Sequence, residues 1–338
     1  MTETLSLLPP SLEALLDAAA RVGGTPRAHL GALGRTVLAP PPGGGELRSD
    51  ASGLNHDGSP LQWCLSAGPG GAAARLLGDP ACTVTDQLAR YRAGRANIPA
   101  LVAATRSEGM RPLLDATLAA HVPADDDWRD EYPDGVLWLA AGVDTPGCGT
   151  YVDARRGGPD AAWERIDRWL HDLTGSAAAA DVYRGIRQRS RLMCVGVEGT
   201  CPDDARAKVY WRMAEATRLD AVGVPAFAAP EFARFVELCV GARRMRLTGV
   251  VLCAGVKVAT GAFADAKLDL CTCPNCLDYT PDESARVAAA VSEAFGIAPL
   301  PLADALETTE LAFLGLGVDA RGRVRFNAYF KEPTRPSS

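Results

Sequence analysis

The chain of 338 residues lacks an apolar run long enough to cross a membrane and lacks an excess of positive charge. A spanning helix needs roughly 18 or more apolar residues, and no segment approaches that length. The start, MTETLSLLPP, has no basic segment before an apolar one, unlike a secretory signal. The net charge of -6 argues against a general surface for nucleic acid or anionic membrane. These absences favour a cytoplasmic protein whose ten cysteines stay mostly reduced.

What is present is the composition of an ordinary soluble protein, with 47% hydrophobic and 22% charged residues. The length allows one large domain or two. An amphipathic helix is predicted near the start, because Leu12, Leu15 and Leu16 fall on one stripe and two glycines follow it.

A stretch rich in proline and glycine, residues 39–46, is typical of a linker. We therefore expect an amino-terminal helical segment with its linker over 1–46. The main domain is expected over 47–333, and a short tail over 334–338.

The segment RAKVYWRM, residues 206–213, alternates with the period of a β-strand. One face carries Arg206, Lys208, Tyr210 and Arg212, and the other carries Ala207, Val209, Trp211 and Met213. For a single strand, the ordinary interpretation is a charged face in water and an apolar face on a core.

The same alternation recurs along the chain. Near the carboxyl end, the polar set is Arg323, Arg325, Asn327, Tyr329 and Lys331. Lys267 and Asp269 likewise alternate with Ala266, Leu268 and Leu270. Each segment follows an apolar run and a polar turn, which predicts a hairpin. Two further hairpins are predicted at 52–79 and 136–154, so the hairpin is an internal repeat of five.

Helical patterns lie between the hairpins. Amphipathic helices need apolar strand faces to cover, so the polar strand faces must point the other way. About ten antiparallel strands is near the number at which a sheet closes, and closure removes its exposed edges. We expect an α+β fold, a ten-stranded antiparallel barrel ringed by helices, with a polar lumen wide enough for a ligand.

The hairpin repeats resemble the ABBA-type aromatic prenyltransferases, a superfamily that includes fungal and bacterial indole prenyltransferases and cyanobactin peptide prenyltransferases. The resemblance rests on Arg-x-Lys-x-Tyr at 206–210 and on DGSPLQWCLS in the first hairpin, and covers about residues 48–333. It implies repeated αββα units and an enzyme that moves a prenyl group, dimethylallyl or geranyl, from an allylic diphosphate to an electron-rich aromatic acceptor. The acceptor is either a small molecule or a residue in a peptide.

The resemblance also implies roles for individual residues. The diphosphate-binding positions are Arg75, Arg206, Lys208, Lys267 and Arg325. The tyrosines that shield the carbocation are Tyr151, Tyr210 and Tyr329. Two positions depart from the pattern: Gly149 stands where the family has a lysine, and Asp269 stands where fungal members tend to have a tyrosine. The chain is therefore not close to the fungal branch.

These residue types suit the chemistry on their own. Fixed cations in a cavity of low dielectric stabilise a departing diphosphate. Aromatic faces attract the remaining cation by roughly 0.5 to 2 kcal/mol without reacting with it.

The catalytic residues are predicted to be Gln62 and Glu198. The family's Pro-x-Glu motif is Pro60-Leu61-Gln62 here, and an amide accepts a hydrogen bond but takes no proton at neutral pH. Glu198 is the alternative proton acceptor. A neutral group suffices when the nucleophile is carbon, so an indole acceptor is favoured, either tryptophan in a peptide or an indole metabolite.

Two other motifs are typical of metal sites. Asp126, Asp127 and Asp130 match the Asp-Asp-x-x-Asp magnesium motif of all-helical isoprenoid synthases, although only one copy is present. This motif leaves magnesium open as a cofactor, and no cofactor is predicted to be required. A non-catalytic barrel that binds an anionic or phosphorylated lipid is the alternative to an enzyme.

The last motif is a cysteine cluster, Cys271, Cys273 and Cys276, whose spacing suits zinc thiolate ligands. Cys253 on the paired strand is the candidate for a fourth ligand, and no histidine is near in sequence. The alternative places these cysteines at the barrel rim, and no metal ligand is assigned.

Overall fold

The computed structural model describes residues 8–39, 52–123, 132, 135–243, 246–273 and 276–333. Within them, ten strands form one closed barrel in which every neighbouring pair is antiparallel. The strands are β1 Leu61–Gly68, β2 Gly71–Gly78, β3 Leu137–Gly142, β4 Cys148–Asp153, β5 Ser190–Gly199, β6 Arg206–Met213, β7 Val250–Lys257, β8 Phe263–Cys271, β9 Glu310–Asp319 and β10 Val324–Lys331. Pairing of β1 with β10 closes the barrel, so the predicted fold is confirmed.

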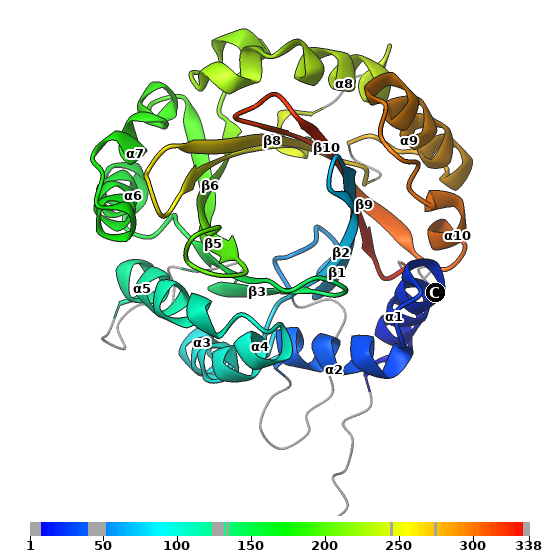
Figure 1. Cartoon of the computed structure of the whole chain (residues 1–338), viewed down its shortest axis with the longest axis horizontal. Helices are drawn as coiled ribbons and strands as arrows, with labels where there is room; N and C mark the ends of the chain where they lie inside the picture. The colour runs from blue at the N-terminus through cyan, green and yellow to red at the C-terminus, as the bar shows by residue number, and fades with distance from the viewer. Residues whose placement is uncertain are drawn as a thin grey trace, which may run out of the picture.

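Helices form an outer ring around the barrel, which Figure 1 shows in a view along its axis. They are α1 Pro10–Gly23, α2 Arg27–Leu38, α3 Gln87–Ala96, α4 Ile98–Ala104, α5 Arg111–His121, α6 Gly158–Thr174, α7 Ala178–Asp181, α8 Pro230–Val240, α9 Pro281–Phe295 and α10 Leu302–Leu306. The amino-terminal pair lies in the ring, with α1 against α10 and α2 against α4. The domain boundary predicted at residue 46 lies outside the described residues and stays a prediction.

Local sequence signals set several helix ends. The side chain of Thr280 accepts a hydrogen bond from the backbone N–H of Glu283, and the Glu283 carboxylate accepts one from the backbone N–H of Thr280, which together begin α9. Gly24 adopts a φ of 69° immediately after α1, as the predicted glycine stop requires. No helix of the described residues is both long and apolar enough to span a bilayer.

The main hydrophobic core lies between the barrel and the helices. Trp211 of β6 points outward, where its ring centroid is 5.9 Å from that of Phe227. Phe326 of β10 likewise faces Phe235 of α8, at 6.4 Å. Burying one such aromatic side chain stabilises the fold by about 4 to 6 kcal/mol before entropy is counted. This outer core holds the apolar strand faces outward and therefore leaves the polar faces inside the barrel.

One residue of the predicted polar series lies elsewhere. Arg323 precedes β10, is exposed, and pairs with Asp319 in the turn between β9 and β10. The inward series of β10 therefore begins at Arg325.

Candidate functional site

The barrel interior contains a large cavity of about 630 Å³ and a smaller one of about 420 Å³. The large cavity lies at the barrel end away from the hairpin turns, and its apolar walls include Leu77, Trp138, Val251 and Phe313. The smaller cavity lies at the turn end, beside residues 145–147 and 199–200. The volume of the large cavity is within the range of about 300 to 1,000 Å³ that is usual for ligand pockets.

All ten predicted site residues lie inside the barrel. Gln62, Tyr151, Tyr210, Lys267 and Tyr329 line the large cavity, and Glu198, Arg206 and Arg325 line the smaller one. Arg75 lines both cavities, and Lys208 is 1% exposed and contacts Glu198.

A group of paired charges lies where the two cavities meet. We call it the ionic layer, and its residues are Arg75, Glu198, Arg206, Lys208, Asp265 and Arg325. Glu198 is at its centre, and its oxygens lie 2.9 Å from an Arg75 nitrogen, 2.6 Å from an Arg206 nitrogen and 2.7 Å from Lys208 Nζ. The hydroxyl of Tyr151 also donates to this carboxylate.

Asp265 is the second carboxylate of the ionic layer. Its Oδ2 accepts a hydrogen bond from Arg206 at 2.6 Å and lies 3.7 Å from an Arg325 nitrogen. Sequence reasoning missed this residue, although a signal existed, because Asp265 continues the inward period of Lys267 and Asp269 along β8.

Three inward carboxylates, those of Glu198, Asp265 and Asp269, each lie over a glycine on a neighbouring strand. A Cβ at Gly149 would lie 2.9 Å from Glu198 Cβ, a Cβ at Gly255 would lie 2.5 Å from Asp265 Oδ1, and a Cβ at Gly315 would lie 2.0 Å from Asp269 Oδ1. These glycines therefore make room for the carboxylates. The glycine that replaces the family's lysine at 149 has a structural reason, since Glu198 occupies the space beside it.

The cations keep Glu198 ionised. Burial alone would raise its pKa, but Lys208, Arg206 and Arg75 outweigh burial and hold the pKa well below its usual value. The five predicted diphosphate-binding cations thus face three carboxylates, Glu198, Asp265 and Asp269. Taken together, these eight side chains carry two net positive charges, which suits an anionic ligand.

Lys267 lies among tyrosines in the large cavity. Its Nζ donates to the Tyr329 hydroxyl at 2.9 Å and lies 5.4 Å from the centre of the Tyr210 ring. Asp269 is its ion-pair partner at 2.5 Å. Burial raises the pKa of Tyr329 to about 12, so its phenol stays neutral. The arrangement presents a cation to an anionic ligand and aromatic faces to a cationic one.

Gln62 is oriented by a residue that sequence reasoning missed. The Nδ2 of Asn55 donates to the backbone carbonyls of Ser59 at 2.9 Å and Leu61 at 3.4 Å, so its Oδ1 is the acceptor. That oxygen accepts a hydrogen bond from Gln62 Nε2 at 2.7 Å. Gln62 therefore keeps its carbonyl oxygen as the acceptor for a donor in the large cavity. No pattern in the loop pointed to Asn55.

The sequence offered two candidate sets of metal ligands, an aspartate motif and a cysteine cluster. Asp126, Asp127 and Asp130 lie outside the described residues. Cys253 is opposite Lys267 in the barrel register, and Lys267 lies four positions before Cys271, about 13 Å along the strand. Cys253 is therefore wrong as a partner for the cysteine cluster.

Solved prenyltransferase structures superpose on this fold. The 5-dimethylallyltryptophan synthase from Streptomyces coelicolor superposes with a TM-score of 0.76 at 19% identity, over 97% of this chain and 98% of that chain. The chain therefore has the ABBA prenyltransferase fold. The prenyltransferase PriB, in a complex with L-tryptophan and dimethylallyl thiolodiphosphate, gives a TM-score of 0.75 at 20% identity, over 96% of this chain and 97% of that chain.

The fungal branch is also similar in fold. AnaPT from Neosartorya fischeri gives a TM-score of 0.70 at 11% identity, over 97% of this chain and 94% of that chain. No protein-family model and no curated protein matches the sequence. The chain thus shares the ABBA fold with these enzymes. At these low sequence identities the fold does not determine the reaction, which depends on the residues of the site.

Proposed function

We propose that the protein is an aromatic prenyltransferase that transfers a short prenyl group from an allylic diphosphate to an indole. The observation that carries this proposal is that the oriented Gln62 carbonyl and the Lys267–tyrosine group line the same cavity. The similarity to PriB, whose structure holds L-tryptophan and a dimethylallyl thiolodiphosphate, supports it.

The diphosphate would lie against Lys267 and Arg75, on the cavity side of the ionic layer. Both side chains already donate to the Tyr329 hydroxyl, Arg75 at 3.3 Å, so they converge on one point. Heterolysis of the C1–O bond leaves its electron pair on the diphosphate, whose growing charge these fixed cations stabilise. From the ionic layer, Arg206, Lys208 and Arg325 would add to the electrostatic stabilisation of this negative charge.

The allylic cation would lie between the aromatic faces. Tyr151 and Tyr210 meet edge to face with ring centroids 5.8 Å apart, and Tyr329 faces them across Lys267. Buried neutral phenols exclude water and attract the cation without attacking it. The indole ring carbon then forms the new bond to C1.

The indole N–H would donate its hydrogen bond to the Gln62 carbonyl. The arenium ion formed by attack is a strong acid, so it needs no strong base. Its proton would pass through the Tyr151 hydroxyl to Glu198, which accepts from that hydroxyl. The low pKa of Glu198 does not prevent transfer from so strong an acid.

Gln62→Ala is expected to raise the KM for tryptophan or an indole peptide by roughly tenfold, about 1.4 kcal/mol, because the acceptor loses one buried hydrogen bond. The KM for dimethylallyl diphosphate should change much less. Steady-state kinetics with each substrate varied in turn measures both values. Gln188→Ala, an exposed glutamine, is the control. Equal acceptor KM values in Gln62→Ala and the parent would show that Gln62 is structural.

Glu198→Gln is expected to bind inorganic diphosphate roughly tenfold more tightly than the parent. The change removes a carboxylate that competes with the ligand for Arg75, Arg206 and Lys208. Isothermal titration calorimetry at constant ionic strength measures the affinity. Unchanged affinity in this variant would place the diphosphate away from the ionic layer, and weaker binding would contradict competition by the carboxylate.

Turnover separates the transferase from the alternative functions. Incubation with dimethylallyl or geranyl diphosphate and tryptophan, tyrosine or cyclic peptides, followed by mass spectrometry, should show a prenylated indole. Binding of the prenyl diphosphate without product for any acceptor would favour the lipid-binding barrel. The barrel itself argues against an Asp-rich-motif synthase, whose motifs lie on facing helices.

A further inference from the structure

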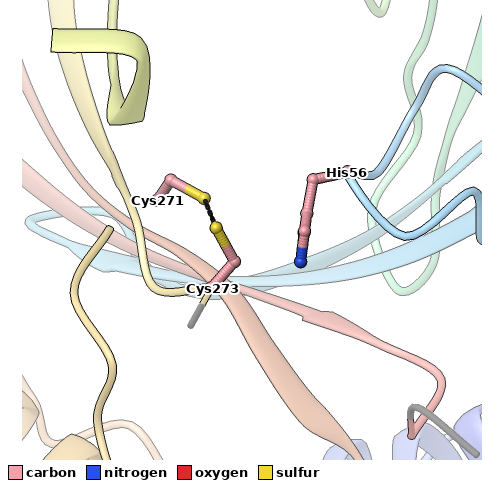
Figure 2. A group of neighbouring side chains, drawn as sticks. All are labelled: His56, Cys271 and Cys273. Atoms are coloured by element: carbon pink, nitrogen blue, oxygen red, sulfur yellow. Dashed lines mark hydrogen bonds between the residues drawn. The ribbon is translucent and has the colours of Figure 1, made fainter. Parts of the chain in front are cut away.

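The cysteine cluster lies beside a histidine from a distant part of the chain. Cys271 ends β8, Cys273 and Cys276 follow it, and His56 comes from the loop before β1. Figure 2 shows the His56 side chain beside the side chains of Cys271 and Cys273. The fold thus supplies the nearby histidine that the linear sequence lacks.

The distances fit a single metal ion. One potential ligand atom each from His56, Cys271 and Cys273 lies within 4.8 Å of the others. Tetrahedral zinc with bonds of about 2.3 Å to sulfur holds its ligand atoms about 3.8 Å apart. The two thiols of Cys271 and Cys273 are 3.0 Å apart, so they would separate by about 0.8 Å around zinc.

Cys276 completes the set. Its backbone N–H donates to the Cys273 carbonyl at 2.9 Å, which turns the chain back toward Cys273. Cys273 and Cys276 have the Cys-x-x-Cys spacing of zinc sites. The ligand atoms that already lie within 4.8 Å of one another are those of His56, Cys271 and Cys273, so the Cys276 sulfur would move toward them when the metal binds.

We propose that His56, Cys271, Cys273 and Cys276 form a structural zinc site at the mouth of the barrel. Three thiolates and one imidazole fill the tetrahedral positions of zinc and leave none for a substrate. On binding, the three thiols release their protons to solvent, and His56 binds as neutral imidazole. No residue is oxidised or reduced.

The site would fix a loop that the proposed reaction uses. The loop before β1 carries Gly53 and Leu54, which line the large cavity, and Asn55, which orients Gln62. Asp57 in the same loop pairs with Lys331 of β10 at 2.5 Å. Zinc would attach this loop at a second point, because it would join His56, the residue after Asn55, to the cysteines at the end of β8. The metal would therefore act as a positioning element, and its binding does not depend on the proposed function.

The first experiment measures metal in the full chain. Protein purified without chelators is expected to contain one zinc per chain by inductively coupled plasma mass spectrometry, and cobalt loaded in its place should show tetrahedral, thiolate-type absorption. Cys276→Ser and His56→Ala should each lower zinc affinity by roughly tenfold or more, about 1.4 kcal/mol. Cys201→Ser and His171→Ala, at exposed positions, are the matched controls.

Three results would overturn the proposal. One is metal-free protein that binds no added zinc while its thiols are reduced. Another is an intact mass lower by two hydrogens with a Cys271–Cys273 linkage, which would make the pair a disulfide. The third is unchanged zinc affinity in both His56→Ala and Cys276→Ser. Since His56 is exposed, its variant should fold even if a cysteine variant does not.

A second experiment tests the positioning effect without any activity assay. Removal of zinc by a chelator should increase amide hydrogen exchange in residues 52–60 and leave the outer helix α6 unchanged. Equal protection of this loop with and without zinc would contradict the positioning role, whatever the outcome of prenyl-transfer assays.

Discussion

Lys267→Ala is expected to lower kcat/KM for prenyl transfer by roughly 100-fold or more, about 2.7 kcal/mol of barrier, while the protein stays folded. Lys267 is 4% exposed and lies in the large cavity between Tyr210 and Tyr329. Its charge is therefore little screened by water. Removing it withdraws a fixed cation from the departing diphosphate and leaves Asp269, its partner at 2.5 Å, as an unpaired anion. Steady-state kinetics with circular dichroism measures both activity and fold.

A double variant separates the two parts of this effect. Lys267→Ala with Asp269→Asn removes the unpaired anion as well, so it should recover only a small part of the activity. Lys257→Ala is the control, because this lysine is exposed at the end of β7. Full activity in Lys267→Ala would contradict the assignment of the diphosphate to the large cavity.

Lys208→Met is expected to lower the free energy of unfolding by about 3 kcal/mol. Methionine keeps the length of the side chain but leaves Glu198 and Asp265 without the most buried cation of the ionic layer. Glu198 keeps Arg75 and Arg206 but loses its third cationic partner, and a hydrogen bond to a charged group contributes about 1.5 to 3 kcal/mol. Urea unfolding followed by tryptophan fluorescence measures the change.

The double variant Lys208→Met with Glu198→Gln tests the cause. If the cost comes from the lost Lys208–Glu198 pair, the second change should restore about 1 to 3 kcal/mol relative to the sum of the single effects. A Lys208→Met protein as stable as the parent, or strictly additive effects, would show that the ionic layer contributes little to stability.

Polar–apolar alternation was sufficient to predict which strand face points inward. In β6, Val209 and Trp211 pack on the helices and Lys208 and Tyr210 face the lumen, as the pattern required. Periodicity is a property of sequence neighbours, and helices can cover only apolar strand faces, so the alternation determines both the barrel and its polar interior.

Side-chain partners could not be predicted in the same way. The alternation placed Glu198 in the lumen but could not show that Arg75, 123 residues away along the chain, joins Arg206 and Lys208 in lowering its pKa. Asn55 likewise showed no signal until the fold placed it against Gln62.

The sequence by itself determined the strand repeats, their inward faces and the residue types in the lumen. Only the tertiary structure decided that Glu198, Asp265 and Asp269 lie over glycines of neighbouring strands and that His56 meets the cysteines after β8. The reason is physical: alternation depends on residues one and two positions apart, whereas ion pairs and ligand sets depend on strand register and closure, which bring distant segments within a few ångströms.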